Sequence, residues 1–121
     1  RCAVRAENFG SPPPSPPRRG FAARLERALL DIAGGHGRVH EHRERSWASI
    51  TFAGTRHTVR IVFDTPEAID GGETLIAALP DHEFTLPGRL VADATVSAVD
   101  HVFDPAPSLT MTCELLVLED T

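Results

Sequence analysis

The sequence contains no lysine and no tyrosine, and it has one tryptophan and one methionine among 121 residues. It therefore offers no lysine for a Schiff base with a carbonyl substrate or for the phosphate cradle of a P-loop. No apolar run approaches the roughly 18 residues that a membrane-spanning helix needs. The net charge of −5 argues against a nucleic acid or an anionic membrane as the partner.

Cysteine and the common nucleophile motifs are equally sparse. Cys2 and Cys113 form no C-x-x-C pair and no cluster with metal-ligand spacing, so neither a zinc ribbon nor a thioredoxin-type centre is indicated. Cys113 alternates with apolar neighbours, which predicts a small buried residue. The glycine-rich residues 34–37 follow a predicted helix, whereas a dinucleotide-binding fingerprint follows a strand, so no cofactor is expected. No secretory hydrophobic segment is present, and we expect a cytoplasmic location.

The composition itself is that of an ordinary folded domain, 41% hydrophobic and 24% charged. Prolines concentrate in residues 10–20, where their fixed φ favours polyproline II. We expect residues 1–20 to be a proline-rich tail or linker and residues 21–121 to form a single α+β domain.

The first predicted element of that domain is a helix. Apolar residues recur at spacings of three and four, which places them on one stripe. They are Phe21, Leu25, Ala28, Leu29 and Ile32. Gly34 and Gly35 follow the stripe and predict a left-handed C-terminal cap.

A β-hairpin is predicted next, because two sets of apolar residues alternate with polar ones. The sets are Ala48, Ile50 and Phe52, and then Val59, Ile61 and Phe63. Pairing Phe52 with His57 puts both sets on one face and leaves Gly54-Thr55 as a two-residue turn of type II′. The same register places Trp47 across from Val62 and Arg45 across from Asp64.

A second helix is predicted to start at Thr65-Pro66-Glu67, which supplies a capping hydroxyl and a proline for the first turn. Gly71-Gly72 is expected to leave this helix short or broken, and Pro80 to stop it. Residues 80–88 read as a loop with an extended piece.

A second hairpin closes the predicted fold. Its alternating apolar residues are Leu90, Ala92, Ala94, Val96 and Ala98 in one strand, and Leu109, Met111, Cys113, Leu115 and Val117 in the other. Pairing Val102 with Leu109 and Val96 with Leu115 places both sets on one face. The order is α-β-β-α-β-β, which predicts a four-stranded, mostly antiparallel sheet of two hairpins with helices on one face.

The first candidate site is an arginine-rich outer face of the first hairpin. Its residues are Arg43, Arg45, Trp47, Arg56 and Arg60. Guanidinium forks and an indole ring could bind a carboxylate or a phosphate there, although a solvated sheet face has the same pattern.

The charge is also uneven along the chain. Residues 1–60 contain eleven arginines and five acidic residues, a net +6, whereas residues 61–121 contain one and twelve, a net −11.

Histidines provide two weaker candidates. His40 and His42 are two apart, so on a strand both point to one side, where they could hold a metal, and Glu44 continues that face. His57 is expected on the apolar face near the hairpin tip, as a residue of the core rim. Asp81, His82 and Glu83 lie in a loop, where an acid–base site could form.

Taken together, these patterns favour a non-catalytic domain that forms a homodimer and binds a protein partner or a small anionic ligand. Two alternatives remain open at this point. One is a small enzyme with an acid–base site at Asp81, His82 and Glu83, and the other is a metal-binding domain that uses His40 and His42.

Overall fold

The computed structural model describes residues 16–119. Its elements follow the predicted order. They are α1 (Pro16–Ile32), β1 (Arg38–Ala48), β2 (Ala53–Phe63), α2 (Pro66–Ala78), the 3-10 helix η1 (Leu79–Asp81), β3 (Arg89–Val102) and β4 (Ser108–Glu119). The α+β class is confirmed.

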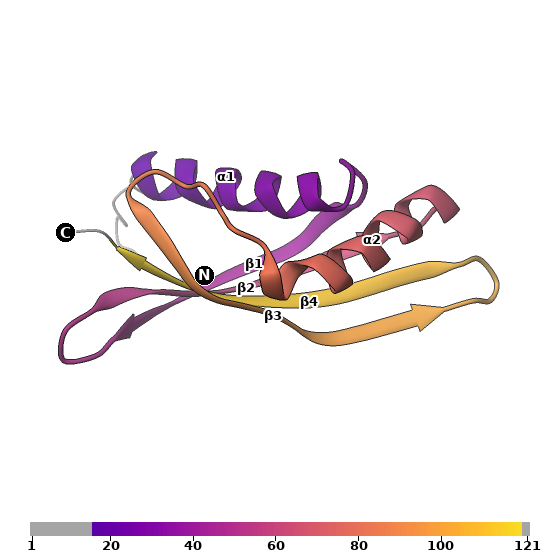
Figure 1. Ribbon diagram of the computed structural model, residues 1–121. Helices are drawn as coiled ribbons and strands as arrows, with labels where there is room; N and C mark the ends of the chain where they lie inside the picture. The colour runs from indigo at the N-terminus through magenta and orange to yellow at the C-terminus, as the bar shows by residue number, and fades with distance from the viewer. Residues whose placement is uncertain (1–15, 120–121) are drawn as a thin grey trace, which may run out of the picture.

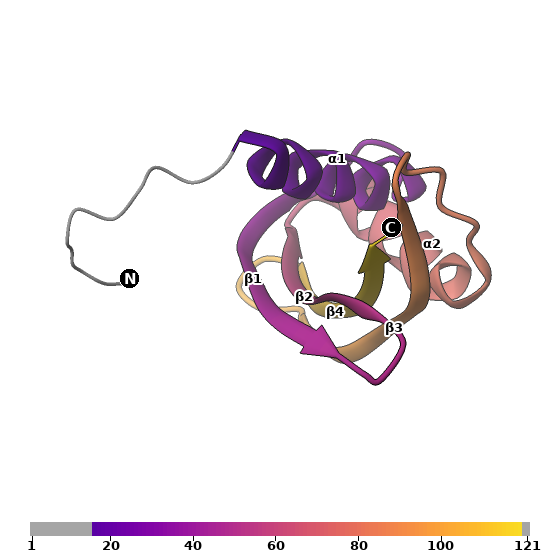
Figure 2. The same ribbon diagram turned by 90° about the vertical axis from the view of Figure 1, so that its left-hand side faces the viewer.

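The four strands form one antiparallel sheet in the order β1-β2-β4-β3. Each predicted hairpin is present, and β2 and β4 join the two hairpins at the centre of the sheet. Both helices lie on the same side of the sheet, and the hairpins extend beyond them in opposite directions (Figure 1). The sheet is strongly curved, and its concave face turns toward the helices (Figure 2).

The core lies between the helices and this concave face. The buried positions alternate along the two central strands, as the pleat requires. They are Val59, Ile61 and Phe63 on β2, and Leu109, Met111, Cys113, Leu115 and Val117 on β4. From above, Phe21, Leu25 and Leu29 of α1 complete the layer. The predicted stripe of the first helix and the buried state of Cys113 are therefore confirmed.

The ends of α1 differ in how well the sequence anticipates them. At the C-terminal end, the Gly35 N–H donates to the Leu30 carbonyl at 2.8 Å, and both Gly34 and Gly35 have positive φ, which is the predicted left-handed cap. At the N-terminal end, the helix begins at Pro16 rather than at Phe21. Proline is tolerated in a first turn because the N–H it lacks has no helical partner there. The rest of the predicted proline-rich tail lies outside the described residues.

The predicted register of the first hairpin is wrong. The turn comprises Ser49 to Phe52, and two hydrogen bonds close it. The Ser49 N–H donates to the Phe52 carbonyl at 2.8 Å, and the Phe52 N–H donates to Ser49 Oγ at 3.1 Å. Ile50 and Phe52 are consequently exposed rather than buried. Gly54 belongs to β2, where a Cβ would lie 2.2 Å from the Val117 carbonyl oxygen, so it permits close approach of β4 rather than a turn.

In the observed pairing, β2 is displaced along β1 by eight residues relative to the predicted register. His57 now pairs with Glu44, Arg56 with Arg45, and Gly54 with Trp47. The proposed partners of Trp47 and Arg45, namely Val62 and Asp64, are therefore replaced. Because the displacement is an even number of residues, each side chain stays on the face of the hairpin to which the predicted register assigned it.

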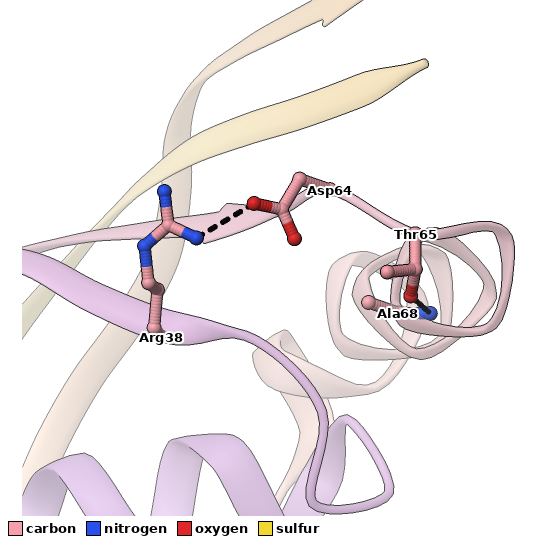
Figure 3. Close-up of polar contacts among 4 residues, drawn as sticks. All are labelled: Arg38, Asp64, Thr65 and Ala68. Atoms are coloured by element: carbon pink, nitrogen blue, oxygen red, sulfur yellow. Dashed lines mark hydrogen bonds and ion pairs between the residues drawn. The ribbon is translucent and has the colours of Figure 1, made fainter. Parts of the chain in front are cut away.

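The start of α2 is as predicted. Thr65 has extended backbone angles and its Oγ1 accepts from the Ala68 N–H at 3.1 Å, with Pro66 at the first helical position (Figure 3). The hydroxyl satisfies one of the N–H groups that the first turn of a helix leaves unpaired.

The prediction that Gly71-Gly72 breaks this helix is wrong, since α2 runs without interruption from Pro66 to Ala78. Packing explains the glycines. A Cβ at Gly71 would lie 2.1 Å from the Ala33 carbonyl oxygen, and one at Gly72 would lie 2.8 Å from Leu109 Cδ2. Both positions lack a side chain because α2 passes close to the end of α1 and to the sheet.

The second hairpin has the predicted strands but not the predicted register. Val102 pairs with Ser108 and Val96 with Cys113, and the register shifts at two irregular positions in β3. The shift between Val91 and Asp93 reverses the alternation, so that Val91 packs against the core and Leu90 is exposed.

Candidate functional site

A cluster of polar side chains lies on the concave face, where α1 crosses the first hairpin. We call it the inner histidine cluster: Glu26 of α1, His42 and Glu44 of β1, and His57 of β2. Glu44 and His57 are direct cross-strand partners, and His42 is two residues along β1 on the same face. The corrected register therefore brings together residues that the predicted register kept apart.

The inner histidine cluster is tightly arranged. His42 Nδ1 lies 2.6 Å from Glu26 Oε2, and His42 Nε2 lies 2.8 Å from His57 Nδ1. The His57 residue is 2% exposed, and the His42 side chain is 8% exposed. The Phe21 ring covers His57 at 5.7 Å between centroids. These contacts tie α1 to both strands of the hairpin in a place with little access to water.

The Glu26 carboxylate fixes which nitrogen of His42 donates to it. A carboxylate of Glu26 only accepts, so His42 Nδ1 carries a proton and donates it. Between the rings, His57 Nδ1 donates to His42 Nε2 when His42 is neutral, and His42 Nε2 donates to His57 Nδ1 when His42 is an imidazolium paired with Glu26. The two ring nitrogens that face each other are thus one acceptor and one donor.

The metal candidates named from sequence are separated by the structure. The register shift between Val39 and Glu41 leaves His40 outside the alternation, and His40 lines a hollow on the outer face of the sheet. His42 points to the inner face instead. The expectation that His40 and His42 share one side is therefore wrong. Sequence spacing did place Glu44 beside His42, but it missed His57, which would have required the correct turn.

Arg43, Arg45 and Arg56 of the predicted arginine face lie close together on the convex side of the sheet, whereas Arg60 lies further along and pairs with Glu41. Arg45 and Arg56 are direct cross-strand partners, and Arg43 pairs with Thr58. Together with Glu44 and Glu114, these residues line a hollow of about 430 Å³. Trp47 lies two pairs further toward the turn, opposite Gly54.

Ion pairs on the same side hold two carboxylates in the charged form. Arg43 Nε donates to Glu41 at 2.6 Å, and this hydrogen bond lowers the pKa of Glu41. Arg38 donates to Asp64 at 2.6 Å, which lowers the pKa of Asp64 (Figure 3). Arg38, rather than Arg45, is thus the partner of Asp64.

The acid–base candidates lie apart from both groups. Asp81, His82 and Glu83 are all exposed, at the end of η1 and in the loop after it. The His82 ring makes an edge contact with Phe84 at 4.6 Å between centroids. This loop does not enclose the three side chains, as a buried acid–base site would require.

Cys113 is also unsuited to nucleophilic chemistry, because burial raises its pKa to about 12.

Large apolar side chains are exposed at both ends of the sheet, near the hairpin turns. They are Ile50, Phe52 and Leu90 at one end, and Val99, Val102 and Phe103 at the other. At the first end, Phe52 and Leu90 border a hollow of about 400 Å³. At the other end, the Phe103 ring stacks on His101 with centroids 4.2 Å apart. We call these two sets the turn patches.

No protein-family model and no curated protein matches this chain. Among solved structures, it is similar to a chain of the virion of a native gene transfer agent particle, with a TM-score of 0.55 and 12% identity. The alignment covers 83% of this chain and 93% of that one. A likeness at this level of identity shows the fold alone. Within residues 16–119, neither helix has the length and apolar character to cross a membrane.

Proposed function

We propose that this chain is a non-catalytic structural subunit that associates with further copies of itself in a multi-subunit particle. The observation that carries the proposal is the pair of turn patches. Six large apolar side chains are at least 42% exposed, and Ile50 is fully so. Exposed apolar residues grouped in this way are typical of protein–protein contacts.

The sheet edges support the same function. β1 and β3 are the outer strands of the sheet and have 11 and 14 residues. Long outer strands present unpaired backbone groups that other chains can pair with. Over most of its length, the fold also resembles that of a chain in a gene transfer agent virion, which is a particle built from many chains. A homodimer, the commonest closed arrangement for soluble chains, is the simplest assembly of this kind.

Light scattering coupled to size exclusion tests the association, with the protein at micromolar concentration. We expect a mass of at least twice 13.1 kDa. Phe103→Glu and Leu90→Glu each place a charge in one turn patch without touching the core. At whichever patch forms the contact, loss of an apolar side chain weakens association about tenfold or more.

Ala23→Glu is the matched control, because Ala23 is exposed on α1 and belongs to neither patch. It should leave the mass unchanged. A monomeric wild-type protein would contradict the proposal. An oligomer that neither patch variant weakens would remove the observation on which it rests.

A second candidate function is the binding of an anion, or of a carboxylate on a protein partner, at the arginine face. Like charges directly opposite each other on neighbouring strands are unfavourable, and Arg45 faces Arg56 in this way. An anion between them removes that repulsion and accepts from two guanidinium groups.

Phosphate should therefore raise the melting temperature more than chloride does at equal ionic strength. Arg56→Gln should abolish the difference, whereas Arg24→Gln, an exposed change on α1, should preserve it. An equal response to the two salts would exclude the site.

A further inference from the structure

We propose that the inner histidine cluster is a divalent transition-metal site, with His42, Glu44 and His57 as ligands and Glu26 as the group that orients His42. This binding activity is independent of the self-association proposed above. One candidate ligand atom from each of the three residues lies within 4.8 Å of the other two. Two imidazoles and a carboxylate are a donor set that zinc and other first-row metals accept.

The distances are close to those that a metal needs. Two nitrogen ligands at 2.0–2.1 Å from a tetrahedral zinc ion are about 3.3 Å apart. His42 Nε2 and His57 Nδ1 are 2.8 Å apart, so the two rings need to separate by about half an ångström. The metal would take the place of the proton that His42 Nε2 and His57 Nδ1 share, and a neutral His57 would then carry its ring proton on Nε2.

Glu26 gives the cluster a feature that a chance grouping of histidines lacks. Ligating histidines commonly donate their second ring N–H to a carboxylate, which fixes the tautomer and the ring orientation. Glu26 accepts from His42 Nδ1 at 2.6 Å and so leaves Nε2 as the ligating nitrogen. The carboxylate belongs to α1 and the ligands belong to β1 and β2, so the metal would join the helix to the hairpin.

The surroundings favour a firmly held ligand set. The ligands are on two hydrogen-bonded strands, and rigid elements position side chains more accurately than loops do. His57 is buried beneath Phe21, and the Arg89 guanidinium lies 4.9 Å from the centroid of the Phe21 ring. Glu44 is partly exposed and would give the metal a route to solvent.

Calorimetric titration of the chelator-treated full chain with Zn²⁺ tests the proposal. We expect saturation at one equivalent per chain and a higher melting temperature with Zn²⁺ than with Mg²⁺, which prefers oxygen ligands. Co²⁺ in place of Zn²⁺ should give visible absorption bands that report nitrogen and oxygen ligands. His42→Gln should abolish the binding, and Glu26→Gln should weaken it about 10- to 100-fold.

His40→Gln is the matched control, because His40 is on the same strand but on the outer face. It should leave the affinity unchanged. If His42→Gln fails to fold, Glu44→Gln, which changes a partly exposed residue, provides the same test through the Co²⁺ bands. The proposal is wrong if the wild-type chain shows no saturable binding, if His42→Gln and Glu44→Gln both bind as the wild type does, or if His40→Gln abolishes binding.

Discussion

Replacing Gly71 with alanine measures how closely α2 packs against the end of α1. The new Cβ would lie 2.1 Å from the carbonyl oxygen of Ala33, whereas real Cβ atoms essentially never come closer than 3.0 Å. The two segments would have to separate by about 0.9 Å. Ala33 is fully buried and the atom in question is backbone, so a side-chain rotation cannot relieve the contact.

Two effects of opposite sign decide the outcome. Helix propensity alone predicts that alanine stabilises an interior helical position by about 1 kcal/mol relative to glycine. Overpacking costs about 1–3 kcal/mol, and rigid backbone on the opposing side places this site in the upper part of that range. We therefore expect Gly71→Ala to lower the free energy of unfolding by about 1–2 kcal/mol, the difference of the two terms.

Gly20→Ala is the matched control, because Gly20 is also helical and, apart from its own helix backbone and chain neighbours, no atom of the described residues lies within 4 Å of its Cβ position. Its free energy of unfolding should rise by up to about 1 kcal/mol. Thermal unfolding followed by circular dichroism resolves the contrast, since 1 kcal/mol corresponds to about 3–6 °C in a domain of this size. If Gly71→Ala raises the melting temperature as Gly20→Ala does, the close approach of α2 to Ala33 is absent and the reasoning fails.

Two further predictions concern ionisable groups. The pKa of Asp64 is lower when folded, so its ion pair with Arg38 stabilises the protein above the unfolded carboxyl pKa of about 3.8. This contribution is lost as the pH falls through the folded pKa. Arg38→Gln should therefore lower the melting temperature slightly at neutral pH, and the difference should vanish in acid. In a Cys2→Ser background, the buried Cys113 thiol, with its pKa near 12, should react with a thiol reagent only as fast as the protein opens. Rapid labelling of the native protein would contradict its burial.

The sequence predicted the features that depend on one residue and its near neighbours. The stripe of α1 is visible as Phe21, Leu25 and Leu29, and the cap of α2 as Thr65 before Pro66. Alternation alone was enough to identify the buried face of β4. These are local regularities, and the order of elements follows from them.

Register and close packing could not be obtained in the same way. The rule that apolar residues face the core assigned Ile50 and Phe52 to a strand, but they belong to an exposed turn that the Ser49 side chain stabilises. Gly71 looked like a helix breaker because its neighbour, Ala33, is 38 positions away in the chain. Long-range contacts of this kind are not encoded in local spacing.

The inner histidine cluster shows how such an error propagates. His57 was correctly assigned to the inner face, but the wrong turn paired it with Phe52 instead of Glu44. Glu26 contributes from a helix whose orientation over the hairpin is set by the packing of α1 on the core. The alternation of side chains along the strand showed that His42 and Glu44 share a face. Only the three-dimensional fold brings Glu26 and His57 beside them.

The sheet order has a consequence for the timing of folding during synthesis. β4, the last strand of the described residues, is an inner strand, and it pairs with both β2 and β3. The pair Gly54–Leu118 joins positions 64 residues apart. Non-local pairings of this kind form slowly, because a long loop must close before any contact compensates for the lost entropy. On a ribosome, one side of β2 in the first hairpin therefore stays unpaired until β4 has been synthesised.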